Sequence, residues 1–364
     1  MSSAVDVLST AADRPPALDD TALFGHPRGL GLLFLTAMWE RFSFYGMRAI
    51  LILYLTQALH WNTARAANLY GTYMMLVLLT PLIGGYLADR IIGTRRSLVI
   101  GGLIIAAGHF CLAFNSMTMF YTGLALIIIG TGFFKPNVST MVGQIYADGD
   151  SRRDAGFTIF YVGINVGAFF GGLICGYLAD TTRFGDSGWH WGFAAAGVGM
   201  LLGLLVYVIF RDKYLPGIGV RAAKQLPDVA APIVAKDSNV ALHALIGATA
   251  GGAISLLLGG VDVLGAFVGV TIGASLAVTI LGSHGEERKR VMAIFLVGFF
   301  VVVFWACYEQ AGSSMNLFAA NNTDLRLGSF HIPAAGFQNV NPAVLCIFPP
   351  VFAWIWVRPP QSGR

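Results

Sequence analysis

Long apolar stretches separated by short polar segments run along most of the chain. A helix needs about 20 mostly apolar residues to cross a lipid bilayer. Ten stretches reach or approach that length, at residues 29–58, 69–88, 97–115, 117–146, 157–178, 191–210, 240–258, 261–281, 291–320 and 341–357. Between the seventh and the eighth, Gly259, Gly260 and Asp262 favour a tight turn. The pattern therefore predicts an all-α protein with ten membrane-spanning helices.

The composition agrees with a membrane protein and excludes an ordinary soluble domain. Hydrophobic residues make up 56% of the chain and charged residues 12%, whereas soluble domains carry roughly 25% charged residues. The four cysteines lie far apart in apolar segments and lack the spacing of a metal site, so we expect core residues. The predicted helices contain no paired Asp, Ser–Lys dyad or His-Glu-x-x-His motif. We therefore expect neither an enzyme nor a metal site, and no nucleic-acid partner.

The basic residues indicate how the chain is oriented. If the N-terminus lies inside, seventeen of the 23 Lys and Arg residues fall in inward-facing segments, and three lie within the predicted helices. Membrane proteins keep most of their Lys and Arg residues in cytoplasmic loops. We expect a multi-pass protein of the cell membrane, surrounded by lipids, with its N-terminus in the cytoplasm.

Glycines recur at intervals of four in two of the predicted helices. Gly163, Gly167 and Gly171 form one such row, and Gly265, Gly269 and Gly273 form another. Small residues on one helical face allow two backbones to approach closely in lipid. The two rows predict close helix packing, with no role in chemistry.

A few charged residues interrupt the apolar segments: Glu40 and Arg41 in the first, Lys135 in the fourth and Glu309 in the ninth. Each costs about 2.5–3.5 kcal/mol at membrane depth, so such groups usually face a polar cavity. Sequence neighbours do not face each other on a helix, and we expect Glu40 to pair with Lys135 instead. Arg41 and Lys135 could then bind a ligand carboxylate. Pro136 predicts a kink beside Lys135.

Other polar residues add candidates for ligand or proton binding. Glu309 follows Trp305 by four positions, which places both on one helical face and suits the carboxylate to proton coupling. Tyr45 is a candidate ligand contact, and Asn165 and Asn341 offer amide donors and acceptors. His109 stands alone in the third segment and is interpreted as a core histidine with satisfied hydrogen bonds.

A compact charged turn follows the second predicted helix. Its sequence, GGYLADRIIGTRRSL, contains Asp89, Arg90, Arg95 and Arg96. The turn resembles the loop between the second and third helices of the major facilitator superfamily, which implies a gating role. The alternative is an ordinary basic cytoplasmic loop.

Three further stretches make the resemblance specific to one family within the superfamily: MWERFSFYGMRAIL, GTGFFKPNVSTMVGQIY and FYVGINVGAFFGG. From residue 28 to about 357 the chain resembles the proton-dependent oligopeptide transporter (POT/PTR) family of that superfamily. The resemblance implies proton-coupled symport of di- or tripeptides, with the proton gradient as energy source and no cofactor. It also implies a Glu40–Lys135 pair and places Glu309 in the extracellular-side gate and the proton relay.

The resemblance also predicts the domain organisation. We expect a cytoplasmic tail at 1–27, a six-helix bundle at 28–212, a cytoplasmic linker at 213–238, an extra helical hairpin at 239–284 and two helices of a second bundle at 285–364. Family members have two six-helix bundles, so the chain is expected to be truncated after its eighth core helix.

The chain departs from the family's first-helix motif at two positions. Ala37 stands where the family has a Glu, and Phe44 replaces a Tyr. A carboxylate at position 37 would lie one helical turn from Arg41, so its absence predicts weakened proton coupling. Two alternatives remain open: transport of another small solute, such as a nitrate-like anion or a drug, and a truncated membrane protein that does not transport.

Overall fold

The computed structural model describes residues 21–147, 149–220, 239–259, 263–328 and 330–357. Most of these residues are helical, and strands β1 (Arg326–Leu327) and β2 (Phe330–His331) form one short antiparallel pair. The predicted all-α class is confirmed. Most of the predicted tail, part of the predicted linker, Gly260, Asp262 and residues 358–364 lie outside the described residues.

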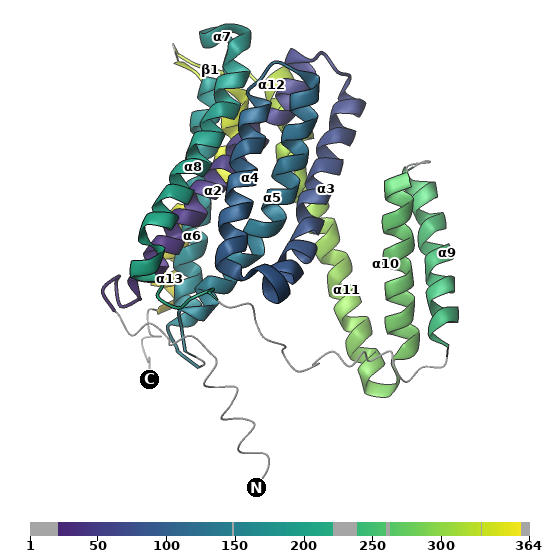
Figure 1. The fold of residues 1–364 in the computed structure, drawn as a ribbon. Coiled ribbons are helices and arrows are strands. Elements are labelled where there is room, and N and C mark those ends of the chain that lie inside the picture. Colours follow the sequence, from purple (N-terminus) through teal and green to yellow (C-terminus); the bar gives the residue numbers. More distant parts are fainter. Residues whose placement is uncertain (1–20, 148, 221–238, 260–262, 329, 358–364) are drawn as a thin grey trace, which may run out of the picture. The chain divides into compact units, whose positions relative to one another are not determined.

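The first helices form a bundle in which α2 is central. They are α2 (Arg28–Leu53), η1 (Tyr54–Ala58), α3 (Thr63–Leu87), η2 (Ala88–Ile92), α4 (Thr94–Leu112), α5 (Met117–Gln144), α6 (Arg153–Leu178), α7 (Thr181–Phe184), η3 (Gly185–Ser187) and α8 (Gly188–Tyr214). Helix α2 packs along α6 and α8, α4 packs between α5 and α8, and α3 packs on α5 (Figure 1).

The rest of the chain divides between two compact units. One unit joins the first bundle to α12 (Ser314–Asn322), η6 (Ala334–Asn339) and α13 (Val340–Val357); the other contains α9 (Val240–Gly259), α10 (Val263–Gly282) and α11 (Gly285–Tyr308). Within the first unit, η6 and α13 pack on α6. The end of this unit where α2 finishes and α7, β1 and α12 lie is called the far end below (Figure 1).

The glycine rows bring helix backbones together, as predicted. On α6, a Cβ atom at Gly167 would collide with the Met38 carbonyl oxygen of α2, and one at Gly171 would collide with the Phe42 carbonyl oxygen. In the other unit, Gly273 approaches the Gly247 backbone equally closely between α9 and α10. Any larger residue at these positions would push the paired helices apart.

The structure corrects the prediction of one continuous helix over 291–320. Helix α11 ends at Tyr308, a 3-10 turn (η5, Glu309–Gly312) follows, and α12 begins at Ser314. Ser313 has φ −123° and ψ −95°, outside the helical region. Gly312 and the two serines after it are poor helix formers, so the apolar stretch does not continue as a helix through them.

Seven helical stretches among the described residues are long and apolar enough to cross a membrane. One of them, Arg153–Tyr214, contains both α6 and α8, and another, Gly285–Asn322, contains α11 and α12. Helix α2 is not among them, and it is the helix that carries Glu40, Arg41 and Arg48. The protein is a multi-pass membrane protein whose central helix is charged.

Candidate functional site

Two charged side chains of α2 form an ion pair inside the bundle. The Arg41 Nε lies 2.6 Å from the Glu40 Oε2, and the residues are only 7% and 1% exposed. The prediction that these sequence neighbours would each need a partner elsewhere is therefore wrong. Neighbouring Cβ atoms do point apart on a helix, but the long arginine side chain bends back and brings its guanidinium to the carboxylate.

Lys135 of α5 adds a second positive charge to this pair. Its side chain is half-buried, and its charge acts on the Glu40 carboxylate together with that of Arg41. The predicted attraction between Glu40 and Lys135 is thus present, although Arg41 shares it. With all three groups ionised, the cluster of Glu40, Arg41 and Lys135 carries one net positive charge. An anion is the natural ligand of such a cluster.

The packing of α5 fixes where Lys135 lies. Helix α5 continues through Pro136 to Gln144, and the neighbouring Asn137 donates its side-chain amide to the Phe133 carbonyl at 2.6 Å. The Thr80 hydroxyl of α3 donates to the Ile128 carbonyl at 2.9 Å. These bonds satisfy polar groups of the helix around its proline and hold α5 against α3.

Three other candidates lie in the same unit but differ in their surroundings. Tyr45 is half-buried, with its ring 5.3 Å from Phe44 and 5.6 Å from the Arg48 guanidinium. Asn165 is 5% exposed and donates to the carbonyl of Tyr161 in its own helix at 2.9 Å. Asn341 is exposed near the start of α13. Their roles as ligand contacts stay predictions.

Trp305 and Glu309 belong to the second unit. Trp305 is 50% exposed, and its ring meets that of Tyr308 edge-on at 5.2 Å. Glu309 is half-buried at the point where α11 gives way to the 3-10 turn. At such a break, backbone N–H and C=O groups that would be hydrogen-bonded in a regular helix lie near the carboxylate.

The predicted gating loop is anchored through one of its arginines. Arg95 donates to the Asp212 carboxylate at 2.7 Å and to the carbonyls of Leu215 and Ile218 at 2.5 and 3.2 Å. These bonds tie the start of α4 to the end of α8 and to the residues that follow it. Asp89, Arg90 and Arg96 are exposed.

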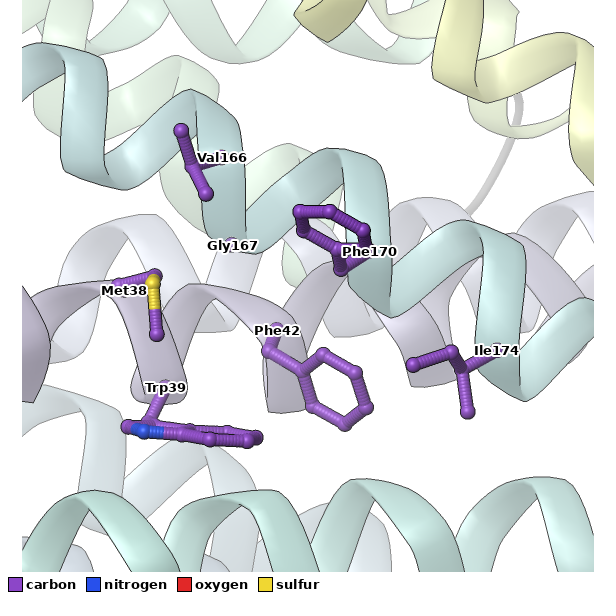
Figure 2. Close-up of a pocket in the computed structure, with 7 residues that line it drawn as sticks. All are labelled: Met38, Trp39, Phe42, Val166, Gly167, Phe170 and Ile174. Carbon is purple, nitrogen blue, oxygen red and sulfur yellow. The ribbon is translucent and has the colours of Figure 1, made fainter.

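An apolar groove of about 210 Å³ lies between α2 and α6 (Figure 2). Its lining side chains are hydrophobic on both helices: Met38, Trp39, Phe42, Val166, Gly167, Phe170 and Ile174. None of these residues offers a charged group to a ligand, so the groove does not match a site for a charged solute. Glu40 lies on the opposite face of α2 from the row Met38–Phe42. Arg41 begins nearer the groove, with its Cβ atom close to Gly167, but its guanidinium turns to the Glu40 carboxylate.

The sequence did not reveal a set of polar contacts at the far end. Arg48 is 4% exposed and donates from Nε to the Tyr70 hydroxyl at 2.7 Å. Asn316 of α12 and Gln338 of η6 both donate to the Ala49 carbonyl. Amides within apolar stretches were the available signal, but nothing in the sequence indicates that residues so distant along the chain meet.

Two further buried polar residues lie in the first unit. His109 is fully buried, as predicted, but neither ring nitrogen has a hydrogen-bond partner among the described residues, so it is not a satisfied histidine. Asn339, which the sequence analysis did not single out, reaches α6. The Nδ2 of its side-chain amide donates to the Phe169 carbonyl, and the Oδ1 accepts from the Leu173 N–H.

Comparison with known proteins places the chain among transporters. Residues 95–360 match the model of the POT family (PTR2). The chain is 38% identical over 343 residues to the uncharacterized transporter YclF of Bacillus subtilis, covering 92% of this chain and 68% of that protein. It is 34% identical over 356 residues to a di-/tripeptide transporter of Lactococcus lactis subsp. cremoris, covering 93% and 70%.

A solved structure shares the fold as well. The crystal structure of a peptide transporter POT in complex with sulfate matches with a TM-score of 0.76 and 37% sequence identity. The match covers 96% of this chain and 72% of that one.

Proposed function

The chain belongs to the POT family, and we propose that it carries out proton-coupled symport of di- and tripeptides across the cell membrane. The relative from Lactococcus lactis is a di-/tripeptide transporter, and the similarity extends over almost the whole of this chain. The charged cluster of Glu40, Arg41 and Lys135 supplies the chemistry that such a substrate needs. No catalytic step on the peptide is required.

The observation that carries the proposal is the net positive charge of this buried cluster. One carboxylate faces two cations, at 2.6 Å from Arg41 and within the field of Lys135. Every peptide with a free C-terminus presents a carboxylate, which a guanidinium can bind through two hydrogen bonds. The peptide carboxylate would occupy the place beside Arg41 and Lys135 and complete the neutralisation of the cluster.

Proton coupling follows from the same geometry. When Glu40 takes up a proton, Arg41 and Lys135 lose their shared counterion, and a peptide carboxylate becomes the remaining anion available to them. Protonation and peptide binding therefore favour one another, and by thermodynamic linkage the effect is mutual. Glu309, where α11 ends, is the second carboxylate proposed for proton transfer.

The remaining assignments complete the proposed transport cycle. Tyr45, Asn165, Trp305 and Asn341 are proposed contacts to the rest of the peptide. The turn with Asp89, Arg90, Arg95 and Arg96 is proposed to act as a gate.

The proposed orientation places the N-terminus in the cytoplasm. The arginine-rich end of the first unit then faces inward, and the far end faces outward. The five predicted regions are kept as the proposed domain boundaries.

Competition by a peptide and its C-terminal amide tests the proposal. The chain is reconstituted into liposomes, and uptake of a labelled dipeptide is measured while unlabelled Ala-Ala or Ala-Ala amide competes. The acid should compete about tenfold or more better than the amide, because a charge-assisted hydrogen bond contributes about 1.5–3 kcal/mol. Arg41→Ala and Lys135→Ala should each reduce this preference.

A surface lysine provides the matched control. Lys289 is exposed at the start of α11 and pairs with the exposed Glu286, so Lys289→Ala should leave both uptake and the preference unchanged. Equal competition by the acid and the amide in the unaltered protein would refute carboxylate recognition by this cluster.

A further inference from the structure

A single backbone carbonyl near the far end of α2 accepts hydrogen bonds from two distant side chains. Asn316 Nδ2 of α12 donates to the Ala49 carbonyl oxygen at 2.9 Å, and Gln338 Nε2 of η6 donates to the same oxygen at 3.3 Å. The donors lie 267 and 289 positions along the chain from Ala49. Two elements from the end of the chain therefore converge on one atom of the central helix.

The burial of Asn316 shows that this contact is well enclosed. The residue is 2% exposed, and its Oδ1 has no hydrogen-bond partner among the described residues. Burying an amide whose oxygen has no hydrogen-bond partner costs free energy. The hydrogen bond from the Asn316 Nδ2 to Ala49 offsets part of this cost and holds the side chain in place. If α12 moved away from α2, both atoms of the amide could reach other partners.

Gly312 brings the backbone before α12 equally close to the bundle. A Cβ atom there would collide with the Tyr70 hydroxyl and lie 2.8 Å from the Arg48 Nε. Arg48 and Tyr70 come from α2 and α3 and are joined by a hydrogen bond of 2.7 Å. The contact at Gly312 thus lies beside the one at Ala49 and joins the same parts of the chain.

We propose that Asn316 and Gln338 are positioning residues of the transport cycle, which hold α12 and η6 on the far end of α2 and thereby set how often that end opens. The inference rests on the proposed function, because alternating access requires such contacts to break on one side of the membrane. Ala49 lies eight residues after Arg41, or about 12 Å along the helix. The contact that closes the far end therefore involves the same helix, α2, that carries Glu40 and Arg41.

The chemistry of this contact distinguishes it from the ion pair at Glu40. Amide side chains do not titrate, so the strength of the two bonds to Ala49 is the same at every physiological pH. The population of the closed far end is then set by neutral hydrogen bonds. Protons and peptide can shift it only through their different affinities for the closed and open states.

Distances between two spin labels on the far end test the proposal. The labels are attached at Ala67→Cys on α3 and Asn322→Cys on α12, both exposed positions. Cys175 is fully buried and can be retained, while the other three cysteines are replaced by serine. Without peptide, Asn316→Ala and Gln338→Ala should each raise the ratio of long to short distances about 2- to 12-fold, the range expected for one hydrogen bond.

Two further variants sharpen the test. Asn316→Asp should make the ratio depend on pH, because the carboxylate cannot donate to Ala49 whereas the protonated acid can. Gly312→Ala should raise the ratio as well, since its methyl group displaces Tyr70 and Arg48. Asn321→Ala, an exposed asparagine of the same helix, is the matched control and should leave the distances unchanged.

The outcomes separate this proposal from a purely structural role and from the proposed function. Lower thermal stability of Asn316→Ala and Gln338→Ala with unchanged distances would overturn the proposal. The measurement uses neither peptide nor proton gradient, so a shifted ratio supports it even if dipeptide uptake fails. Normal uptake with unshifted distances would refute it while leaving the proposed function intact.

Discussion

The Arg41 Nε lies 2.6 Å from the Glu40 Oε2, so the ion pair at the centre of the bundle is made by two consecutive residues of one helix. No movement between helices is needed to break it, because protonation of Glu40 alone removes the attraction. Lys135 feels the same change from α5. Glu40 therefore controls how strongly both cations attract a substrate anion.

Replacing Glu40 by Gln should separate peptide binding from proton coupling. The amide cannot exchange a proton, while Arg41 and Lys135 remain to hold the peptide carboxylate. One coupled proton supports about tenfold accumulation for each unit of pH difference. We expect Glu40→Gln to lose this accumulation in liposomes but to exchange labelled for unlabelled dipeptide.

Glu286→Gln is the matched control for that experiment. Glu286 is an exposed carboxylate at the start of α11, and its variant should accumulate peptide normally. If Glu40→Gln still accumulated dipeptide in response to the gradient, another carboxylate, such as Glu309, would be the coupling group.

Ala37 is the position at which a carboxylate would compete with the substrate. Ala37 is 1% exposed and lies four residues before Arg41 on α2, so a Glu there would reach the guanidinium. We expect Ala37→Glu to weaken dipeptide binding at pH 7.5 and to recover part of it as the pH is lowered and the added carboxylate takes up a proton. Ala37→Gln has nearly the same size without the charge. Identical pH dependence of the two variants in a binding assay would contradict the prediction.

The close packing of α2 on α6 predicts a strong effect of a single methyl group. Gly167→Ala places a Cβ atom against the Met38 carbonyl oxygen and should destabilise the protein by about 1–3 kcal/mol, as overpacking generally does. Gly71 of α3 has no atom within 4 Å of the Cβ position, so Gly71→Ala should be neutral or stabilising by up to about 1 kcal/mol. Thermal unfolding in detergent compares them, and equal Tm values would contradict this packing.

Asp150, in the loop between α5 and α6, predicts a dependence of stability on acid pH. Hydrogen bonds from the Arg152 side chain and backbone N–H hold the pKa of Asp150 below its ordinary value of 3.8. A lowered pKa stabilises the folded state above the unfolded-state pKa, and this contribution is lost as the pH falls through the folded-state pKa. The Tm difference between the unaltered protein and Asp150→Asn should be constant above about pH 5 and shrink below about pH 4. A difference that stayed constant down to pH 3 would contradict this origin.

Features that depend on local sequence could be predicted, because their physical cause lies within one helix. The row Gly163, Gly167 and Gly171 predicted a close helix contact from spacing alone, and α2 fills it. The same reasoning failed for Glu40 and Arg41, since it considered the directions of the Cβ atoms and not the reach of a long side chain.

Contacts between residues far apart in the sequence could not be predicted. Asn316 and Gln338 meet Ala49 only because α12 and η6 fold back onto α2. This folding back belongs to tertiary packing, which local patterns do not encode. The interruption of the helix at Ser313 is different, because Gly312 and the two serines after it are a local signal that the apolar pattern outweighed.

Proton uptake during dipeptide binding tests the central claim most directly. Isothermal titration calorimetry in buffers of different ionisation enthalpy gives the number of protons taken up when the peptide binds. We predict net uptake by the unaltered protein, and none by Glu40→Gln, which should still bind the peptide. No uptake by the unaltered protein, or the same uptake by Glu40→Gln, would contradict a cluster in which protonation of Glu40 prepares Arg41 and Lys135 for the peptide carboxylate.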